Sequence, residues 1–451
     1  MNGAAQLPLG VAELSFTASG DSLVRRTILP SGVRILSEQV PGARSATVGY
    51  WVAVGSRDEL PASYGSTHFL EHLLFKGTAT RSALDIAVSF DSVGGEHNAM
   101  TAKEYTCYYA KVQDRDLEMA VEVLSDMLTS SLLDPLEFEN ERGVILEELA
   151  MADDDPADVT SERFFEAVFG EHPLGRPIGG NPDTIQAATR DSVWEHYRAN
   201  YGPRDLVITV AGAVDHDALV AGVQKALVAA GWNLEREATP VERRTSNEQL
   251  IERGSPLVVV QRPIEQANIL LGVPGISATD DRRSTMAVLN SILGGGMSSR
   301  LFQEIREKRG LAYSVYSFSP SYADAGLFGL YAGCSPSKAG QVAELLLGEF
   351  RRLADGGVTD EEMRRASGQL SGASALALED SDTRMSRLGR SELTHGEFTD
   401  LDEALRRLSL VTATDVRELA GELASRPLSI ASVGTVEESA FAGLSDEPVA
   451  V

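Results

Sequence analysis

The chain has 451 residues, of which 43% are hydrophobic and 24% are charged, and its formal net charge is −26. This length and composition suffice for two or more packed domains and exclude long-range disorder. The acidic balance, without any basic cluster, argues against nucleic acid or an anionic membrane as a partner. Basic peptides are electrostatically favourable partners.

The cysteines and the first residues of the chain predict a cytoplasmic protein. Cys107 and Cys334 lie far apart and form no C-x-x-C motif, so we expect no disulfide framework and two packed strand residues. Residues 1–21 contain no Lys or Arg, which a secretory signal or a mitochondrial presequence would carry. No apolar run approaches the roughly 20 residues of a membrane span.

Alternating apolar residues predict strands near the start of the chain. After a loose tail over residues 1–22, Arg25–Leu29 and Val33–Gln39 are expected to form a hairpin around a Pro-Ser-Gly turn. Ala46–Val54 is expected to add a further strand.

Residues 68–72 read His-Phe-Leu-Glu-His, the inverse of the commoner H-E-x-x-H motif of zinc peptidases. Helical spacing puts His68 and His72 on one face, where two neutral imidazoles can bind one divalent cation. Glu71 lies close enough to accept a proton from a water at the metal without being a ligand. The alternative is that these are only partly buried polar residues of an amphipathic helix. Large apolar neighbours would isolate such groups, so we expect zinc to satisfy them.

Apolar residues at helical or alternating spacing predict the elements that follow in the first half. They are helices over Ser82–Val93, Asp114–Leu132, Asp134–Met151, Pro156–Phe169, Arg190–Tyr201 and Asp215–Ala230, and strands over Thr106–Val112 and Leu206–Ala211.

The helix after Asp134 can supply a third ligand. Asp134 is a typical N-cap and Pro135 a typical first helical residue. Glu141 and Glu148 are seven residues apart and share one face, whereas Glu147 points elsewhere. One such carboxylate would complete a three-ligand site with an open fourth position. In the alternative, these residues form a solvated acidic face.

The second half of the chain repeats the first at a constant offset. Tyr109-Ala110 recurs as Tyr331-Ala332, and the stretch Arg204–Gly212 recurs as Arg426–Gly434, in both cases 222 residues further on. This repeat predicts two α+β halves of about equal size.

The expected domain boundaries follow from the repeat and from a charged linker. We place domains at residues 23–235 and 255–445, with a linker over residues 236–254. The segment Thr285–Arg300, which should correspond to the metal helix, contains neither His nor Glu. Only the first half is therefore expected to carry a metal.

Together these motifs resemble the pitrilysin-type inverted-zinc metallopeptidases, a family that includes insulin-degrading enzyme and the mitochondrial processing peptidases. The resemblance covers nearly the whole chain after residue 23 and is to short, two-domain members. It implies two homologous α/β-roll domains, each an antiparallel-rich sheet packed with helices. It also implies one zinc ion per chain, with Glu148 as its third ligand and Glu141 as a residue that orders the site.

The resemblance extends to residues that would bind substrate. The sequence Gly94–Ala99, followed by Thr101 and Glu104, resembles an edge strand on which the family holds peptides by β-augmentation, with Asn98 and Ala99 at the contact. His97 in this stretch is expected to be a strand residue and not a ligand. Arg306 and Tyr313 match a segment that binds substrate and stabilises the oxyanion. Arg309 and Tyr316 are also seven residues apart and offer an alternative register.

The resemblance further implies an activity and an assembly. Mitochondrial processing peptidases read an arginine near the cut with two acids, which fall here on Asp158 and Glu162; these could equally be a solvated helix face. Short members pair two chains into a clam-shaped chamber. A homodimer is expected here, because this one chain carries both the zinc-binding half and the half with Arg306 and Tyr313. The expected function is a zinc endopeptidase acting on peptides or unfolded segments. The alternative is a non-catalytic structural or interaction protein of the same fold, but such relatives typically lack the zinc residues.

Overall fold

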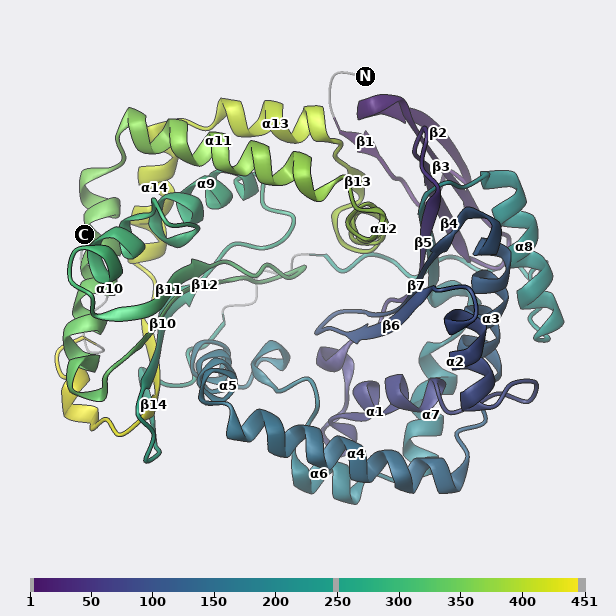
Figure 1. The fold of residues 1–451 in the computed structure, drawn as a ribbon, viewed down its shortest axis with the longest axis horizontal. Helices are drawn as coiled ribbons and strands as arrows, with labels where there is room; N and C mark the ends of the chain where they lie inside the picture. Colours follow the sequence, from purple (N-terminus) through teal and green to yellow (C-terminus); the bar gives the residue numbers. More distant parts are fainter. Residues whose placement is uncertain (1–3, 246–250, 445–451) are drawn as a thin grey trace. The chain divides into compact units, whose positions relative to one another are not determined.

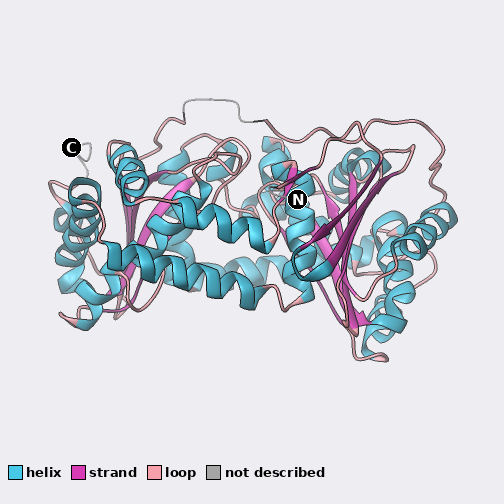
Figure 2. Ribbon diagram, turned by 90° about the horizontal axis from the view of Figure 1, so that it is seen from above, coloured by secondary structure: helices cyan, strands magenta, loops and turns pink. Residues whose placement is uncertain are grey.

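The computed structural model describes residues 4–245 and 251–444. They divide into two units, each built on one main sheet that has helices beside it (Figure 2). The prediction of an α+β protein with two sheet-and-helix domains is confirmed. Among the described residues, no helix is long and apolar enough to cross a bilayer.

The first unit contains residues up to 149, residues 177–243 and residues 375–403. Its sheet has the strand order β2-β3-β4-β8-β5-β7-β6, and every neighbouring pair is antiparallel except β4 and β8. The strands are β2 (Glu13–Ala18), β3 (Ser22–Ile28), β4 (Arg34–Gln39), β5 (Ser45–Val52), β6 (Glu96–Thr101), β7 (Thr106–Gln113) and β8 (Leu206–Gly212). Strand β6 forms one edge of this sheet.

One face of this sheet packs against helices that follow in the same half of the chain (Figure 1). Alternation along β5 sends Val48, Tyr50 and Val52 into this core, while Trp51 points to the opposite face. The helices of the first half are α1 (Ser66–Leu74), α2 (Ala83–Asp91), α3 (Leu117–Ser130), α4 (Pro135–Asp154), α5 (Pro156–Phe169), α6 (Pro182–Ala187), α7 (Arg190–Asn200) and α8 (His216–Ala229).

The second unit contains residues 150–176, 244–374 and those from 404 onward. Its sheet has the order β11-β12-β10-β14-β9, with only β14 and β9 parallel. The strands are β9 (Leu257–Gln261), β10 (Ala267–Pro274), β11 (Ala312–Phe318), β12 (Leu327–Cys334) and β14 (Ser429–Gly434). The helices of the second half are α9 (Arg283–Gly294), α10 (Ala339–Gly356), α11 (Asp360–Ala377), α12 (Ser381–Arg390), α13 (Leu401–Leu410) and α14 (Ala413–Ala424).

The two units exchange one helix each. Helix α12 comes from the second half of the chain but packs on β4, β5 and β8 of the first sheet (Figure 1). Helix α5 comes from the first half but packs on β10 and β14 of the second sheet. The units therefore differ from the contiguous domains predicted at 23–235 and 255–445, because each sheet buries its second face with a helix from the other half.

The predicted repeat is visible in matching elements. Strands β5 and β10 begin 222 residues apart, and so do helices α3 and α10. The described residues of the predicted linker, 236–245 and 251–254, carry no helix or strand; residues 246–250 lie outside the described part.

The prediction of a loose N-terminal tail is wrong for residues 4–22. Strand β2 pairs with β3, and a short strand β1 (Ala5–Gln6) pairs with β13 (Glu397–Phe398). Leu7 is 1% exposed and belongs to the apolar cluster beneath α12. The apolar residues of this stretch are interrupted by Gly, Pro and Glu, which is typical of a loose tail, but residues 375–403, here called the exchanged segment, give them a surface to pack on.

Candidate metal centre

Helix α1 places its three polar residues on the side away from the core. Phe69, Leu70, Leu73 and Leu74 are fully buried, so His68, Glu71 and His72 remain partly exposed on the opposite side. Phe69 stacks on Phe138 of α4 with ring centroids 4.4 Å apart. The predicted cap of α4 is present, because Asp134 Oδ1 accepts a hydrogen bond from Leu136 N at 2.8 Å. The two ligand-bearing helices thus contact each other directly.

His68, His72 and Glu148 converge as the sequence predicts. Glu148 Oε2 lies 3.8 Å from His68 Nε2 and 3.4 Å from His72 Nε2. Ligand atoms about 2.0–2.1 Å from a tetrahedral zinc would lie roughly 3.3 Å from one another. Among the described residues, these three form the one group of histidine, cysteine and carboxylate side chains with metal-like spacing.

The protonation of His68 also fits a metal. Burial, followed by the neighbouring His72, lowers the pKa of His68 to about 4, so the imidazole is neutral at neutral pH. His68 Nδ1 is buried without a hydrogen-bond partner in the described part of the chain. A neutral His68 that carries its proton on Nδ1 leaves Nε2 free to bind. Two imidazoles and one carboxylate are a donor set that zinc uses with an open fourth position.

Glu141 holds His72 from behind, as the resemblance implies. Its Oε2 lies 3.0 Å from His72 Nδ1, and its Oε1 forms an ion pair with Lys76 Nζ at 2.7 Å. The Glu141 side chain is 5% exposed. Zinc-binding histidines usually donate their second N–H to such a carboxylate, which fixes the tautomer and the orientation of the ring.

We expect Glu141→Gln to weaken zinc binding by about 10- to 100-fold. His72 and Lys76 contact different oxygens of Glu141, and a glutamine has an acceptor oxygen at only one of these two positions. Competition with a chromogenic chelator measures the dissociation constant. Glu139→Gln is the matched control, since Glu139 lies on the same helix but is exposed and forms an ion pair with Arg142. Equal zinc affinity in the two variants would contradict a role for Glu141 at the metal.

Glu71 is held by a residue for which the sequence indicated no role. Thr101, the last residue of β6, donates its hydroxyl proton to Glu71 Oε2. Burial raises the pKa of Glu71, and the Thr101 hydrogen bond and the neighbouring His72 oppose the shift. The carboxylate is therefore fixed in place and has a raised proton affinity. Thr101 lies in the edge-strand motif, but only the fold reveals that it contacts α1.

The predicted substrate residues Asn98 and Ala99 lie on the edge strand β6. Asn98 is exposed, and its Oδ1 accepts a hydrogen bond from Ala99 N at 2.8 Å. Strand β6 pairs with β7 on one side, and no described strand pairs with its other side. His97, also on β6, stacks on Phe90 with ring centroids 4.5 Å apart, which agrees with its predicted structural role.

Arg306 and Tyr313 lie in the second unit and contact each other. The guanidinium carbon of Arg306 lies 4.4 Å from the centroid of the Tyr313 ring, which is 77% exposed, and Arg306 Nη1 donates to Tyr313 O at 2.9 Å. In the alternative register, Arg309 forms an ion pair with Glu304 at 2.6 Å, and Tyr316 stacks on Tyr331. The structure thus pairs Arg306 with Tyr313, and their role at the substrate stays a prediction.

Asp158 and Glu162 lie on α5 in the second unit, and both are exposed. Burial and the neighbouring Asp155 raise the pKa of Asp158. A solvated face and an acidic subsite both agree with this placement. Recognition of arginine by these residues stays a prediction.

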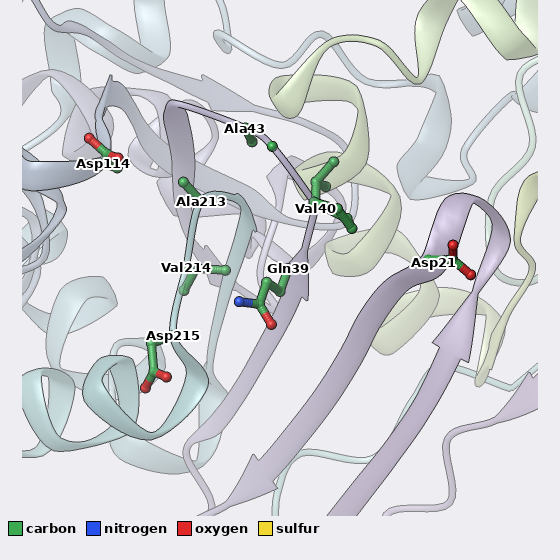
Figure 3. A pocket seen from close by; sticks show the side chains of 10 residues that line it. Asp21, Gln39, Val40, Ala43, Asp114, Ala213, Val214 and Asp215 are labelled. Carbon is green, nitrogen blue, oxygen red and sulfur yellow. The ribbon is translucent and has the colours of Figure 1, made fainter.

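A separate cavity of about 500 Å³ lies beside the turn between β4 and β5 (Figure 3). Asp21, Asp114 and Asp215 line it, together with backbone and apolar groups. Figure 3 shows that these carboxylates are spread around the cavity and do not converge. Asp215 caps helix α8, and Asp114 lies 3.6 Å from Arg44. None of the predicted site residues lines this cavity, so we assign no chemistry to it.

Both cysteines are free and buried, in strands β7 and β12, as predicted.

Comparisons with known proteins show the family to which the chain belongs. The family model "Insulinase (Peptidase family M16)" matches residues 34–182, and "Peptidase M16 inactive domain" matches residues 187–370. An uncharacterized zinc protease of Streptomyces coelicolor is 49% identical, over 95% of this chain and 93% of that protein. Uncharacterized zinc proteases of Mycobacterium tuberculosis and Bacillus subtilis are 45% and 38% identical; each alignment covers 91% of this chain, and 93% and 98% of the respective relatives.

Two solved structures share the fold. The crystal structure of a protease from Helicobacter pylori has a TM-score of 0.81 at 23% identity and covers 94% of this chain and 99% of that chain. A structure described as a peptidase M16 inactive domain, from Pseudomonas fluorescens, also has a TM-score of 0.81, at 19% identity over 95% of this chain and 99% of that chain. The sequence matches over nearly the whole chain establish the family: this chain belongs to peptidase family M16, the insulinase family.

Proposed function

We propose that the protein is a zinc-dependent endopeptidase that cleaves peptides or unfolded polypeptide segments. The observation that carries this proposal is the convergence of His68, His72 and Glu148 on one point, with Glu71 fixed beside them by Thr101. The names of the relatives, which describe zinc proteases, agree with it. A non-catalytic member of the fold would have no need of a positioned proton acceptor next to the three ligands.

In this mechanism, His68, His72 and Glu148 would hold the zinc. When bound, zinc lowers the pKa of a water molecule in its open position and polarises the peptide carbonyl. Glu71 accepts the proton of the attacking water and later donates it to the leaving amine. Thr101 keeps Oε2 of Glu71 fixed, which leaves the other carboxylate oxygen for the proton. Lys76 and Glu141 keep His72 oriented.

Substrate recognition in this proposal uses the open edge of β6. An extended peptide would pair with the backbone of Asn98 and Ala99 as an additional strand, which binds main chain and is tolerant of sequence. Arg306 and Tyr313 would contact the substrate carbonyl as it becomes tetrahedral. The predicted homodimer would enclose the site, and a closed chamber would admit only peptides and unfolded segments.

The test is a digest of a peptide library by the purified protein. We expect a strong chelator to abolish cleavage and added zinc to restore it. Without the metal, the side chains of His68, His72 and Glu148 cannot polarise the peptide carbonyl or activate a water molecule. The same digest reports whether arginine near the cut is preferred, as Asp158 and Glu162 predict. Cleavage that resists the chelator, or a zinc-loaded protein that cleaves nothing in the library, would contradict the proposal.

A further inference from the structure

The loop between β5 and α1 is fixed against the turn that follows β6. A Cβ on Gly55 would lie 2.3 Å from the backbone carbon of Lys103, so a glycine is required at this close approach. Ser56 N and Arg57 N donate to Ala102 O and Lys103 O at 3.1 and 3.0 Å. Arg57 forms an ion pair with Glu104 at 2.6 Å, and both side chains are 10% exposed or less. The loop thus holds one end of the strand that carries Thr101.

The same loop also carries a carboxylate that caps helix α1. Glu59 is 5% exposed, and it accepts hydrogen bonds from Gly65 N at 2.8 Å and from Thr67 N at 2.7 Å. The cap residue Gly65 has no side chain, and no local side chain caps α1. Glu59 therefore satisfies two backbone donors at the N-terminus of α1 from outside the helix.

This cap lies next to the first metal ligand. His68 follows Thr67 directly and is in the first turn of α1. A helix N-terminus carries roughly half a positive charge, which acts over the first turn and disfavours a cation there. The buried carboxylate of Glu59 offsets that charge and also fixes the turn from which His68 projects.

We propose that Glu59 is a positioning residue for the metal centre: it orients His68 and offsets the positive end of α1, and so raises the affinity for a divalent cation. This inference rests on the proposed function, because it requires a metal at His68 and His72. Glu59 binds the backbone of the helix start, at Gly65 N and Thr67 N, beside the first predicted ligand. Its effect is transmitted through the backbone of Gly65 and Thr67 and through its charge.

The test compares two helix caps within one chain. In Glu59→Gln, an amide group replaces one carboxylate oxygen and faces a backbone N–H, and the negative charge is lost. We expect zinc binding to weaken by about tenfold or more, measured by chelator competition on the metal-free protein. The absorption spectrum of the cobalt-substituted protein should also change, because the geometry at His68 changes.

Ser82→Ala is the matched control. Ser82 caps α2, a helix of the same length without predicted ligands, and accepts from Asp85 N at 3.2 Å. We expect it to lower the melting temperature but to leave zinc affinity and the cobalt spectrum unchanged. Glu59→Asp keeps the charge but is too short to reach both donors, so its affinity should be intermediate; it also serves if Glu59→Gln does not fold.

The outcomes separate this inference from the proposed function. If the wild-type protein binds no zinc, the proposed function and the role of Glu59 both fail. If the wild-type protein binds zinc and Glu59→Gln binds it equally well, with only a loss of stability like that of Ser82→Ala, then Glu59 is a structural cap alone. A cobalt spectrum that is unchanged in both Glu59 variants would also overturn the inference.

Discussion

Replacing Glu71 with glutamine should lower kcat by about 10²- to 10⁴-fold, the usual contribution of a positioned general base, while zinc stays bound. Glutamine has the same shape and can still accept the hydrogen bond from Thr101, but it cannot take up a proton at neutral pH. The three ligands are unchanged. Peptide cleavage under saturating substrate gives kcat, and metal analysis of the same sample gives the zinc content.

Glu147→Gln is the control for this experiment. Glu147 is exposed and lies beside the ligand Glu148 in sequence, so the substitution makes the same chemical change close to the site. We expect it to keep both zinc and activity. A Glu71→Gln protein that has lost its zinc would mean that Glu71 is a ligand, and one that keeps more than about a tenth of wild-type kcat would mean that another group accepts the proton.

Two of the three residues that converge at the candidate metal centre could be predicted from local geometry. The spacing of His68 and His72 specifies one face of a helix whatever the rest of the chain does. Glu148 has no such local pattern, because it lies on a distant helix. It could be predicted only from the family resemblance and from its seven-residue spacing from Glu141. The structure brings all three together.

The resemblance implied Glu141 behind His72, but two other supporting residues, Thr101 and Glu59, could not be predicted from the sequence. Thr101 contacts Glu71 only because the edge strand β6 runs beside α1, and Glu59 caps α1 only because its loop folds back on the helix N-terminus. Both contacts depend on tertiary structure and involve common residue types. A glutamate nine residues before a histidine carries no recognisable pattern.

The sequence also did not predict that α5 and α12 pack on the sheet of the other half, because this packing depends on tertiary contacts. On α12, Arg384 and Arg387 have the spacing of a solvated helix face, yet both bind Glu38, which is 0% exposed on β4. A sequence reading assigns such charges to the surface, because buried charges are rare unless they are paired. Only the fold reveals the buried partner.

Glu392, which belongs to the exchanged segment (residues 375–403), is the centre of a second buried ion cluster. It is 0% exposed and lies 3.1 Å from Arg26, 3.5 Å from Arg34 and 3.1 Å from Arg243. Burial lowers the pKa of Arg34, and the charge of Glu392 opposes that shift. Arg26 and Arg34 are each 1% exposed, so Glu392 is the carboxylate that compensates two guanidinium groups removed from water.

We expect Glu392→Gln to destabilise the first unit by about 3–5 kcal/mol, the usual cost of removing one partner from a buried ion pair. The chain's three tryptophans, Trp51, Trp194 and Trp232, all belong to the first unit, so tryptophan fluorescence during urea unfolding reports on that unit alone. Trp51 is 1% exposed beneath α12, where a Cβ on Gly389 would lie 2.4 Å from its ring. Its emission should therefore report the loss of the exchanged segment.

The control for Glu392 is an ion pair at the surface of the same unit. Glu118 lies 3.2 Å from Lys225, and both side chains are more than 60% exposed, so Glu118→Gln should cost at most about 1 kcal/mol. The difference between the two variants isolates the effect of burial, since the chemical change is the same. If Glu392→Gln shifts the unfolding midpoint no more than Glu118→Gln does, the arginines do not depend on Glu392, and the exchanged helix is held by its apolar contacts with Trp51 and its neighbours.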